Sequence, residues 1–277
     1  MSASSLLSHV AAIHSKQPFF VLNSEKFLTH LAPEIPEVSH FYSFTANHSQ
    51  APTFAIPDGC IDILFDCDAV SPLAQVCGTK IEAGAVSFDP GHQYFGVRFV
   101  PGIFPDFVAV SAHELIEHEL DLHDVTSSSE RLLEQVINSK NFSQKVDVVS
   151  QFLKKQKRRK ISGLTNQVIA KIRQHKGNIQ INELERFSGY TTRTLQRLFK
   201  NDIGLTPKGF SRVIRCQSAV YDINHSDDLA FSDLAFDLGF SDQSHFLREF
   251  KRLVNITPLE YRNRVKEKTY LERIQCC

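Results

Sequence analysis

The chain has 277 residues, of which 42% are hydrophobic and 22% are charged, a composition typical of a folded globular protein. This length exceeds that of one ordinary domain and predicts two. No apolar run approaches the ~18 residues that cross a bilayer. The first ten residues also lack the pattern of a secretory signal, so we expect a cytoplasmic protein without membrane contact. The six cysteines include no C-x2-C pair and are too sparse for a disulfide framework, which predicts reduced thiols.

The formal net charge of zero conceals a division along the chain. Residues 1–156 contain 9 Lys and Arg and 18 Asp and Glu, a net charge of −9. Residues 157–277 contain 22 and 13 of the same types, a net charge of +9. A basic segment favours nucleic-acid binding, because neutralising phosphates releases counterions. A solvated basic face is the alternative, and charge alone does not decide between the two.

The first part of the chain is predicted to be β-rich. Residues 15–110 consist of short apolar runs broken by turn signals such as Pro57-Asp58-Gly59 and Pro101-Gly102, a rhythm that indicates several strands. The basic run 154–160 is the expected domain boundary. We therefore predict a first domain over 1–156, with strands in 15–110 and helices in 111–156, and a second domain over 157–277.

Three helices are expected at the end of the first domain. Ser111, followed by Glu114 three residues later, predicts a capped helix over 111–120. Apolar residues at helical spacing predict two amphipathic helices over 128–139 and 143–155. We expect this pair to be antiparallel and to supply the main contact of a homodimer, the commonest form of soluble oligomer.

An internal repeat relates residues 181–201 to residues 231–252. Gly189 and Gly239 occupy matching positions 50 residues apart, and a Thr-Pro pair follows each copy. In each copy a helix is expected to end at the glycine, where the missing Cβ permits a sharp turn, and an aromatic residue follows. The repeat therefore predicts two helix-turn-helix units in an all-α second domain.

The second helix of each unit is expected to begin at a cap, Thr191 or Ser241, and to lie in the major groove of DNA. In the first unit Leu195, Leu198 and Phe199 fall on one side of this helix. The opposite side carries Arg193, Gln196, Arg197 and Lys200. Arg and Gln suit guanine and adenine edges, and Lys suits phosphate. A solvated amphipathic face is the alternative for one such helix, and two matched copies favour DNA reading.

Residues 165–265 resemble the DNA-binding domain of the AraC/XylS family, most closely over 234–251 and the following Thr257-Pro258 to Arg262. The resemblance implies base contacts from both second helices, made by Arg193, Gln196, Arg197, Gln243, Ser244, His245, Leu247 and Arg248. For His245 an ordinary surface histidine is the alternative. Phosphate contacts are expected from Lys200, from Lys251 and from Arg212 and Arg215 on a joining helix predicted over 208–223.

The first unit departs from the family pattern at residues 185–188, where Glu185-Arg186-Phe187-Ser188 stands in place of small apolar residues. Its packing is correspondingly less well defined by the resemblance. The family likeness implies double-stranded DNA and RNA polymerase as partners, as expected of a transcription activator.

Two predicted strands each carry an isolated charge. Asp62 shares a face with Cys60 and Leu64, and Arg98 shares a face with Tyr94, while the opposite faces suit a core. Asp62 and Arg98 therefore point to solvent, pair with each other, or line a polar pocket. With Tyr94 they are the candidate effector-binding residues.

Residues 15–125 resemble a sensor-type domain found ahead of AraC-type regions in some bacterial regulators. The resemblance rests on the runs 57–62 and 95–102 and on Ser111-Ala-His-Glu-Leu115. It implies a small cupin-like β-barrel followed by helices that pair between subunits. A small-molecule effector is the expected ligand of such a domain.

Metal and enzyme functions are not favoured by the sequence. His113 and His118 are five residues apart, about 140° round a helix, so they cannot share one ion as a zinc-protease helix does. Cys60, Cys67 and Cys77 lack zinc-cluster spacing, and the terminal 276–277 pair is expected to fray. We predict no metal, no cofactor and no enzymatic activity.

The sequence thus predicts a two-domain α+β regulator: a cupin-like sensor and dimerisation domain followed by a double helix-turn-helix domain. Its two recognition helices should read successive major grooves. Two alternatives remain open. One is a cupin-type metal enzyme fused to a DNA-binding module, and the other is a dimerising regulator without an effector.

Overall fold

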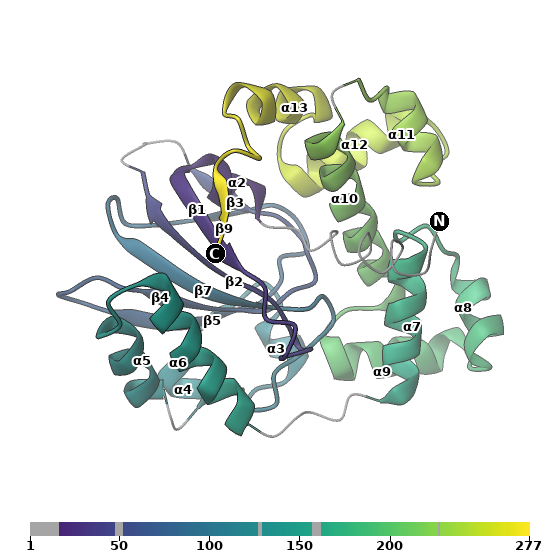
Figure 1. The fold of residues 1–277 in the computed structure, drawn as a ribbon. Coiled ribbons are helices and arrows are strands. Elements are labelled where there is room, and N and C mark those ends of the chain that lie inside the picture. The colour runs from purple at the N-terminus through teal and green to yellow at the C-terminus, as the bar shows by residue number, and fades with distance from the viewer. Residues whose placement is uncertain (1–16, 48–51, 127–128, 157–161, 227) are drawn as a thin grey trace.

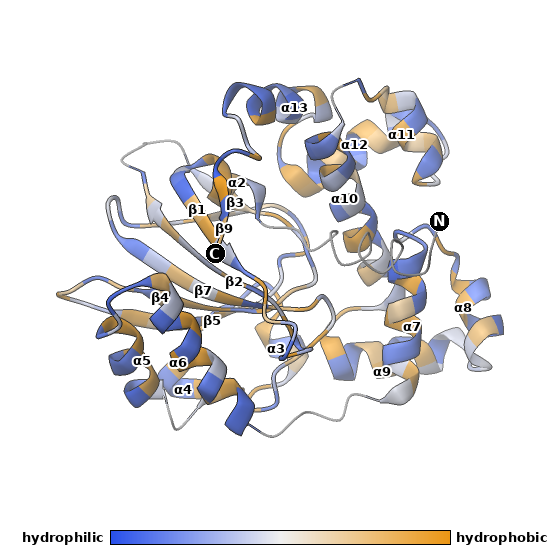
Figure 2. Cartoon of the chain, viewed as in Figure 1, coloured by the Kyte–Doolittle hydropathy of each residue, from blue (hydrophilic) through white to orange (hydrophobic). Residues whose placement is uncertain are grey.

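The computed structural model describes residues 17–47, 52–126, 129–156, 162–226 and 228–277. A β-sheet with short flanking helices occupies the left of Figure 1, and the C-terminal helices occupy the right. Figure 2 shows apolar residues along the strands and on one side of many helices. No helix among the described residues is long and apolar enough to span a membrane.

In the described residues the main sheet has seven strands, in the order β8 (Glu119–Asp121), β5 (Leu73–Cys77), β4 (Asp62–Asp66), β7 (Gln93–Phe99), β2 (Val38–Ala46), β1 (Ser24–His30) and β9 (Ile274–Cys276). Neighbours are antiparallel except β1 and β9, which are parallel. Strands β3 (Thr53–Ala55) and β6 (Gly84–Val86) form a separate pair. The predicted cupin-like barrel is not confirmed, because β8 and β9 stand at opposite edges of an open sheet.

Both faces of the sheet are covered, since alternate side chains point to opposite sides. One face carries Ile63 and Val97 into a core shared with the helices that follow the strands. The other carries Tyr42 and Tyr94 toward α2 (Pro18–Leu22) and the C-terminal helices. Fully burying an aliphatic or aromatic side chain contributes about 1.5–3 kcal/mol, so each face stabilises the sheet substantially.

The helices after the sheet are α3 (Ala112–Leu115), α4 (Leu122–Val125), α5 (Ser129–Ile137) and α6 (Phe142–Lys155). The predicted capping box at Ser111 and Glu114 is confirmed. The predicted extent of that helix, to residue 120, is wrong. Glu117 adopts a φ of 67°, and the chain then enters β8.

The apolar stripes of α5 and α6 are already covered within this chain. Leu132, Val136, Val146 and Val149 are buried in the core that lies against the sheet. The prediction that these stripes are free for a dimer contact is therefore wrong for the most buried positions, including Val136. One face of the sheet covers more of the apolar surface of α5 and α6 than the sequence pattern indicated.

The C-terminal part is all-α, as predicted. Its helices are α7 (Gly163–Gln174), α8 (Ile181–Ser188), α9 (Thr192–Ile203), α10 (Pro207–His225), α11 (Phe231–Asp237), α12 (Gln243–Val254) and α13 (Pro258–Glu267). Two helix-turn-helix units, α8–α9 and α11–α12, lie at the lower and upper right of Figure 1 with α10 between them.

The two parts of the chain share a core. Phe19 and Tyr261 pack edge to face with ring centroids 6.2 Å apart, and one apolar cluster joins α2 and β2 to α10, α12 and α13. The terminal strand β9 returns from the helical part to pair with β1, so the expected frayed end is wrong. The predicted domain boundary falls largely on 157–161, which lies outside the described residues.

Candidate DNA-binding interface and effector pocket

The first unit is shaped by its turn residues. Helix α8 ends at Gly189, whose φ of 74° is accessible to glycine at little strain. Thr191 then caps α9, its side chain accepting a hydrogen bond from the backbone N of Thr194. Glu185, which departs from the family pattern, accepts hydrogen bonds from Thr192 N at 2.5 Å and Thr192 Oγ1 at 2.7 Å. These bonds lower the pKa of Glu185 and fix the angle between α8 and α9.

The second unit repeats this geometry with a different cap. Gly239 has a φ of 69°, and a Cβ placed there would lie 2.1 Å from Asn178 Oδ1, so any other residue would strain the backbone and displace the Asn178 side chain. The predicted cap Ser241 is wrong by one residue. Asp242 caps α12, accepting from the backbone N of His245 at 2.7 Å. The hydrogen bonds from His245 N and Ser241 Oγ lower the pKa of Asp242, which keeps the cap charged.

The outer faces of α9 and α12 carry most of the predicted reading residues. Leu195 and Phe199 of α9, and Phe246 and Phe250 of α12, are buried. The exposed side chains are Arg193, Gln196, Arg197, Lys200, Gln243, Ser244, Arg248 and Lys251. Within the part of the chain described, these side chains make no hydrogen bond or ion pair. They are therefore available to a ligand without first breaking an internal contact.

Other predicted contacts are placed differently. Leu247 packs partly buried against the core. His245 is half-buried, with its Nδ1 3.1 Å from Ser241 Oγ. Arg212 pairs with Glu249, and Arg215 Nη2 donates to Gly177 O at 3.2 Å. These two arginines hold α10 against its neighbours, which makes them weaker candidates for phosphate contacts than the sequence suggested.

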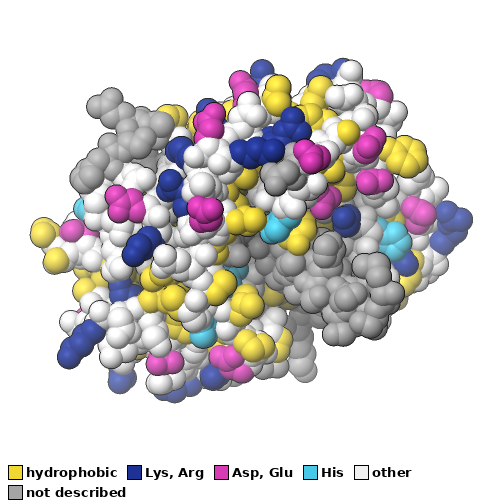
Figure 3. Space-filling model, turned by 45° about the horizontal axis from the view of Figure 1, so that its top comes forward, with side chains coloured by type: hydrophobic (Ala, Val, Ile, Leu, Met, Phe, Trp, Pro, Cys, Tyr) yellow, Lys and Arg dark blue, Asp and Glu magenta, His cyan; other side chains and the backbone are white. Residues whose placement is uncertain are grey.

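Charge on one face of the molecule is mixed rather than of one sign. On the face in Figure 3, Lys and Arg side chains are interspersed with Asp and Glu. The excess of basic residues in the C-terminal half is therefore not one continuous patch on this face.

A cavity of about 150 Å³ lies against the sheet and contains all three predicted effector residues, Asp62, Arg98 and Tyr94. Asp62 and Arg98 are direct cross-strand partners in the β4–β7 ladder. Arg98 Nε donates to Asp62 Oδ1 at 2.8 Å and Nη2 to Oδ2 at 2.5 Å. Two of the alternatives therefore hold together: the residues pair, and they line a pocket. Their role in binding stays a prediction.

Asp58 completes this network and was not singled out as a site residue. Its Oδ2 lies 3.2 Å from Arg98 Nη1 and accepts from Gln17 Nε2 at 2.7 Å. Burial raises the pKa of Asp58, whereas the guanidinium of Arg98 lowers it. Burial would lower the pKa of Arg98, and the two carboxylates overcome that effect and raise it. In sequence, Asp58 was read only as part of a turn.

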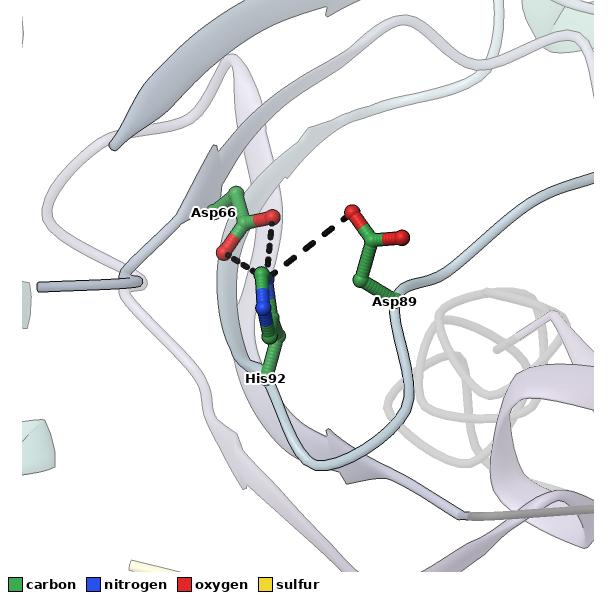
Figure 4. Close-up of side chains that lie close together, drawn as sticks. All are labelled: Asp66, Asp89 and His92. Atoms are coloured by element: carbon green, nitrogen blue, oxygen red, sulfur yellow. Dashed lines mark hydrogen bonds and ion pairs between the residues drawn. The ribbon is translucent and has the colours of Figure 1, made fainter. Parts of the chain in front are cut away.

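The cavity reaches the surface at its lining residue Asp89, whose side chain is 76% exposed, and this mouth lies beside a histidine. Asp66, at the end of β4, and Asp89, on the loop before β7, point toward His92 (Figure 4). His92 Nδ1 lies 2.9 Å from Asp66 Oδ2, and its Nε2 lies 3.6 Å from Asp68 Oδ1. The hydrogen bond to Asp66 raises the pKa of His92. The imidazole is thus occupied as an ion-pair partner. The three residues could offer ligand atoms to an ion, and the absence of a metal stays a prediction.

Both parts of the chain match a family model. Residues 184–264 match a family model described as a helix-turn-helix domain. This chain carries an AraC-type helix-turn-helix domain. Residues 32–121 match a family model described only as a domain of unknown function, DUF6597. The position of that match, ahead of the AraC-type domain, is consistent with a sensor domain.

Several known regulators are similar to this chain over part of their length. The transcriptional activator RhaS of Escherichia coli strain SE11 is 37% identical over 78 residues, 28% of this chain and 27% of that protein. An uncharacterized HTH-type transcriptional regulator of Haemophilus influenzae is 26% identical over 102 residues, 37% of this chain and 34% of that protein. The matches thus span about a third or less of these relatives. The structure of ToxT from Vibrio cholerae O395 matches with a TM-score of 0.41 and 14% identity, over 87% of this chain and 96% of that one.

Segments next to the cavity touch the AraC-type domain at three places. Gln217 of α10 donates through Nε2 to Pro57 O, next to Asp58, at 2.5 Å. Arg252 of α12 pairs with Glu82 at 2.5 Å, on the loop that follows the cavity residue Lys80. Gly204, the C-cap of α9, approaches α3 so closely that a Cβ there would lie 2.5 Å from Ala112 O.

The elements that make these contacts are themselves tied together. Gly59 N donates to Thr79 Oγ1 at 2.9 Å, and Lys80 Nζ donates to Glu117 O at 3.4 Å. Segments next to the cavity thus contact α10, α12 and the end of α9. No signal in the sequence predicts these contacts, because the partners are separated by tens to more than a hundred residues.

Proposed function

We propose that this protein is a transcription regulator of the AraC type that reads double-stranded DNA with α9 and α12. The observation that carries the proposal is the pair of capped, glycine-turned helices with matching outward rows that include Arg197 and Arg248. The 19 residues of α10 span about 28 Å at about 1.5 Å per residue. Successive major grooves lie about 34 Å apart, and the packed bodies of the units supply the difference, or the DNA bends.

The proposal includes an effector. A small molecule in the cavity beside Arg98 would act on DNA binding through the contacts that Gln217, Arg252 and the end of α9 make with segments next to the cavity. A ligand changes DNA affinity only if it binds the DNA-competent arrangement differently from the other one. The shared core between the two parts of the chain favours such coupling, because packed interfaces move as units.

We also propose that the regulator is a non-enzymatic, cytoplasmic homodimer that contacts RNA polymerase as an activator. Because the inner faces of α5 and α6 lie on the sheet, the dimer contact would use their outer faces. A regulator that dimerises without an effector remains the alternative outcome. A metal-dependent enzyme would instead show stoichiometric metal on the purified protein.

The test is DNA binding by the full chain at sites found by genome-wide mapping of its bound positions. Log affinity should fall linearly with log salt concentration, with a slope of about −0.9 per neutralised phosphate. Lys200→Ala should weaken all sites alike and reduce the slope by about 1. Lys26→Ala, exposed on β1 and outside α5, α6 and both helix-turn-helix units, is the control and should leave binding unchanged. A flat salt response would refute the proposal.

A further inference from the structure

We propose that the cavity beside Arg98 binds a small organic cation, of about the size of a benzene ring bearing an ammonium group. The inference rests on the proposed function, because it names the ligand class of the effector pocket. It follows from three properties of the cavity wall: its charge, its aromatic rings and its size.

The wall has a surplus of negative charge. Five of its charged residues are acidic and two are basic: Asp58, Asp62, Asp66, Asp89, Glu119, Lys80 and Arg98. Both cations already face carboxylates. Arg98 lies between two aspartates, and Lys80 Nζ is 3.2 Å from Glu119 Oε1. Arg98 offsets the charge of only one of its two aspartates. Among the described residues Asp66 and Asp89, at the mouth, pair with no Lys or Arg, and they share with Asp68 the one charge that His92 carries when protonated.

This surplus determines which charge on a ligand favours binding in the cavity. Charges interact more strongly in a partly enclosed site than in bulk water, because the local dielectric constant is lower. An entering cation is attracted to the surplus carboxylates, whereas an anion meets them as like charges and finds each cation of the wall already facing a carboxylate. A neutral ligand gains no such attraction and meets no such repulsion.

Four aromatic side chains line the cavity: Phe20, Tyr42, Phe88 and Tyr94. The rings of Phe88 and Tyr94 have centroids 4.7 Å apart, and those of Phe20 and Phe88 are 4.9 Å apart. Aromatic faces attract ammonium groups through the ring quadrupole. The guanidinium of Arg98 already lies 5.8 Å from the Tyr42 centroid, so this wall holds one cation over a ring within the protein itself.

The size of the cavity limits the ligand. A volume of about 150 Å³ matches that of engineered cavities that accept benzene. A ring with a short aminoalkyl arm fits this volume, with the ring among the aromatic residues and the ammonium group toward Asp66 and Asp89 at the mouth. A larger conjugated amine or a peptide does not.

The experiment uses the full chain and three probes of one size: benzylamine, benzyl alcohol and benzoate, each titrated by calorimetry near neutral pH. Benzylamine is a cation there, benzyl alcohol is neutral and benzoate is an anion. We expect benzylamine to bind about tenfold more tightly than benzyl alcohol, and benzoate not to bind. Equal binding of all three, tightest binding of benzoate, or no binding of benzylamine at millimolar concentration overturns the proposal.

A charge-neutral variant locates the site. The side chain of Asp89 is 76% exposed, so Asp89→Asn should fold normally. It should weaken benzylamine about two- to fivefold and leave benzyl alcohol unchanged. The matched control Asp147→Asn, on the exposed side of α6, should change neither. If Asp89→Asn and Asp147→Asn have the same effect, the cation does not lie at this mouth.

A parallel measurement of DNA affinity, with and without saturating benzylamine, separates this proposal from the one on which it rests. Benzylamine that binds in the cavity without changing DNA affinity supports the ligand class and removes the effector role. A chain that binds DNA with the expected salt dependence but not benzylamine overturns the ligand class and leaves the DNA-binding regulator standing.

Discussion

Replacing Arg98 with Met removes the cation from the most buried charge network in the described chain. Arg98 is 3% exposed, and its guanidinium faces Asp62 and Asp58 at 2.5–3.2 Å. Met keeps much of the volume but leaves two buried carboxylates without a counter-charge. Removing one partner of a buried ion pair typically destabilises a protein by about 3–5 kcal/mol. Total stabilities are about 5–15 kcal/mol, so Arg98→Met should remove a large share of the free energy of unfolding.

The loss should depend on pH in a defined direction. Burial raises the pKa of Asp58 above its ordinary value of 3.8, and Arg98 opposes that rise. Without Arg98 the pKa in the folded state should rise further. A carboxyl with a folded pKa above its unfolded value destabilises the fold at higher pH, and the effect is relieved as pH falls toward the unfolded value. The difference between wild type and Arg98→Met should therefore be larger at about pH 8 than at about pH 4.5.

The assay is equilibrium urea unfolding followed by far-UV circular dichroism, which suits a chain without tryptophan. Arg131→Met, on the exposed side of α5, is the matched control and should change stability by less than about 0.5 kcal/mol. If Arg98→Met costs less than about 1 kcal/mol, or costs the same at both pH values, the network is not buried and paired as described.

Three further predictions concern packing, backbone and titration. Val136→Asp should unfold the first part of the chain, because Val136 is fully buried, and a folded monomer by sedimentation and circular dichroism would contradict that placement. Gly239→Ala should lower the melting temperature, because it adds positive-φ strain of about 1–2 kcal/mol and brings a Cβ against Asn178. Gly163→Ala should not, because a Cβ at that position would meet nothing within 4 Å. Equal effects of the two alanines would refute this reading of the turn. His92→Gln should reduce the melting temperature more at about pH 5.5 than at about pH 8.5. The raised pKa of His92 stabilises the fold below the ordinary value of 6.5, and this contribution is lost as pH rises through the folded value. A proton titration of His92 followed by NMR that gives a pKa below 6.5 would contradict it.

The helical half was predictable because its information is local. Gly189 and Gly239 must adopt positive φ, a cap must follow, and apolar residues must recur at helical spacing, all within about 20 residues of one another. The cap at Asp242 was missed because Ser241 and Asp242 are both good caps and adjacent. The position of a turn follows from sequence more securely than the choice between two neighbouring capping residues.

The sheet and the pocket depend on long-range pairing, which the sequence does not display. Whether a sheet closes depends on its edges, and one edge here is β9, supplied from residues 274–276 at the other end of the chain. The alternation along two strands placed Asp62 and Arg98 on defined faces, but only the β4–β7 register makes them opposite each other. Asp58 reaches Asp62 and Arg98 because of the way the turn before β4 folds, and no periodic pattern in the sequence predicts such a turn.

The central claim is that one chain reads two successive major grooves with different helices. Binding-site selection from a random DNA library, with the full chain and with the variants Arg197→Ala and Arg248→Ala, tests it most directly. Wild type should select two blocks of defined sequence about one helical turn apart. Each variant should relax one block, a different one, with a loss of about 1–3 kcal/mol. If both variants relax the same positions, or neither changes the selected sequence, the two-groove account is wrong.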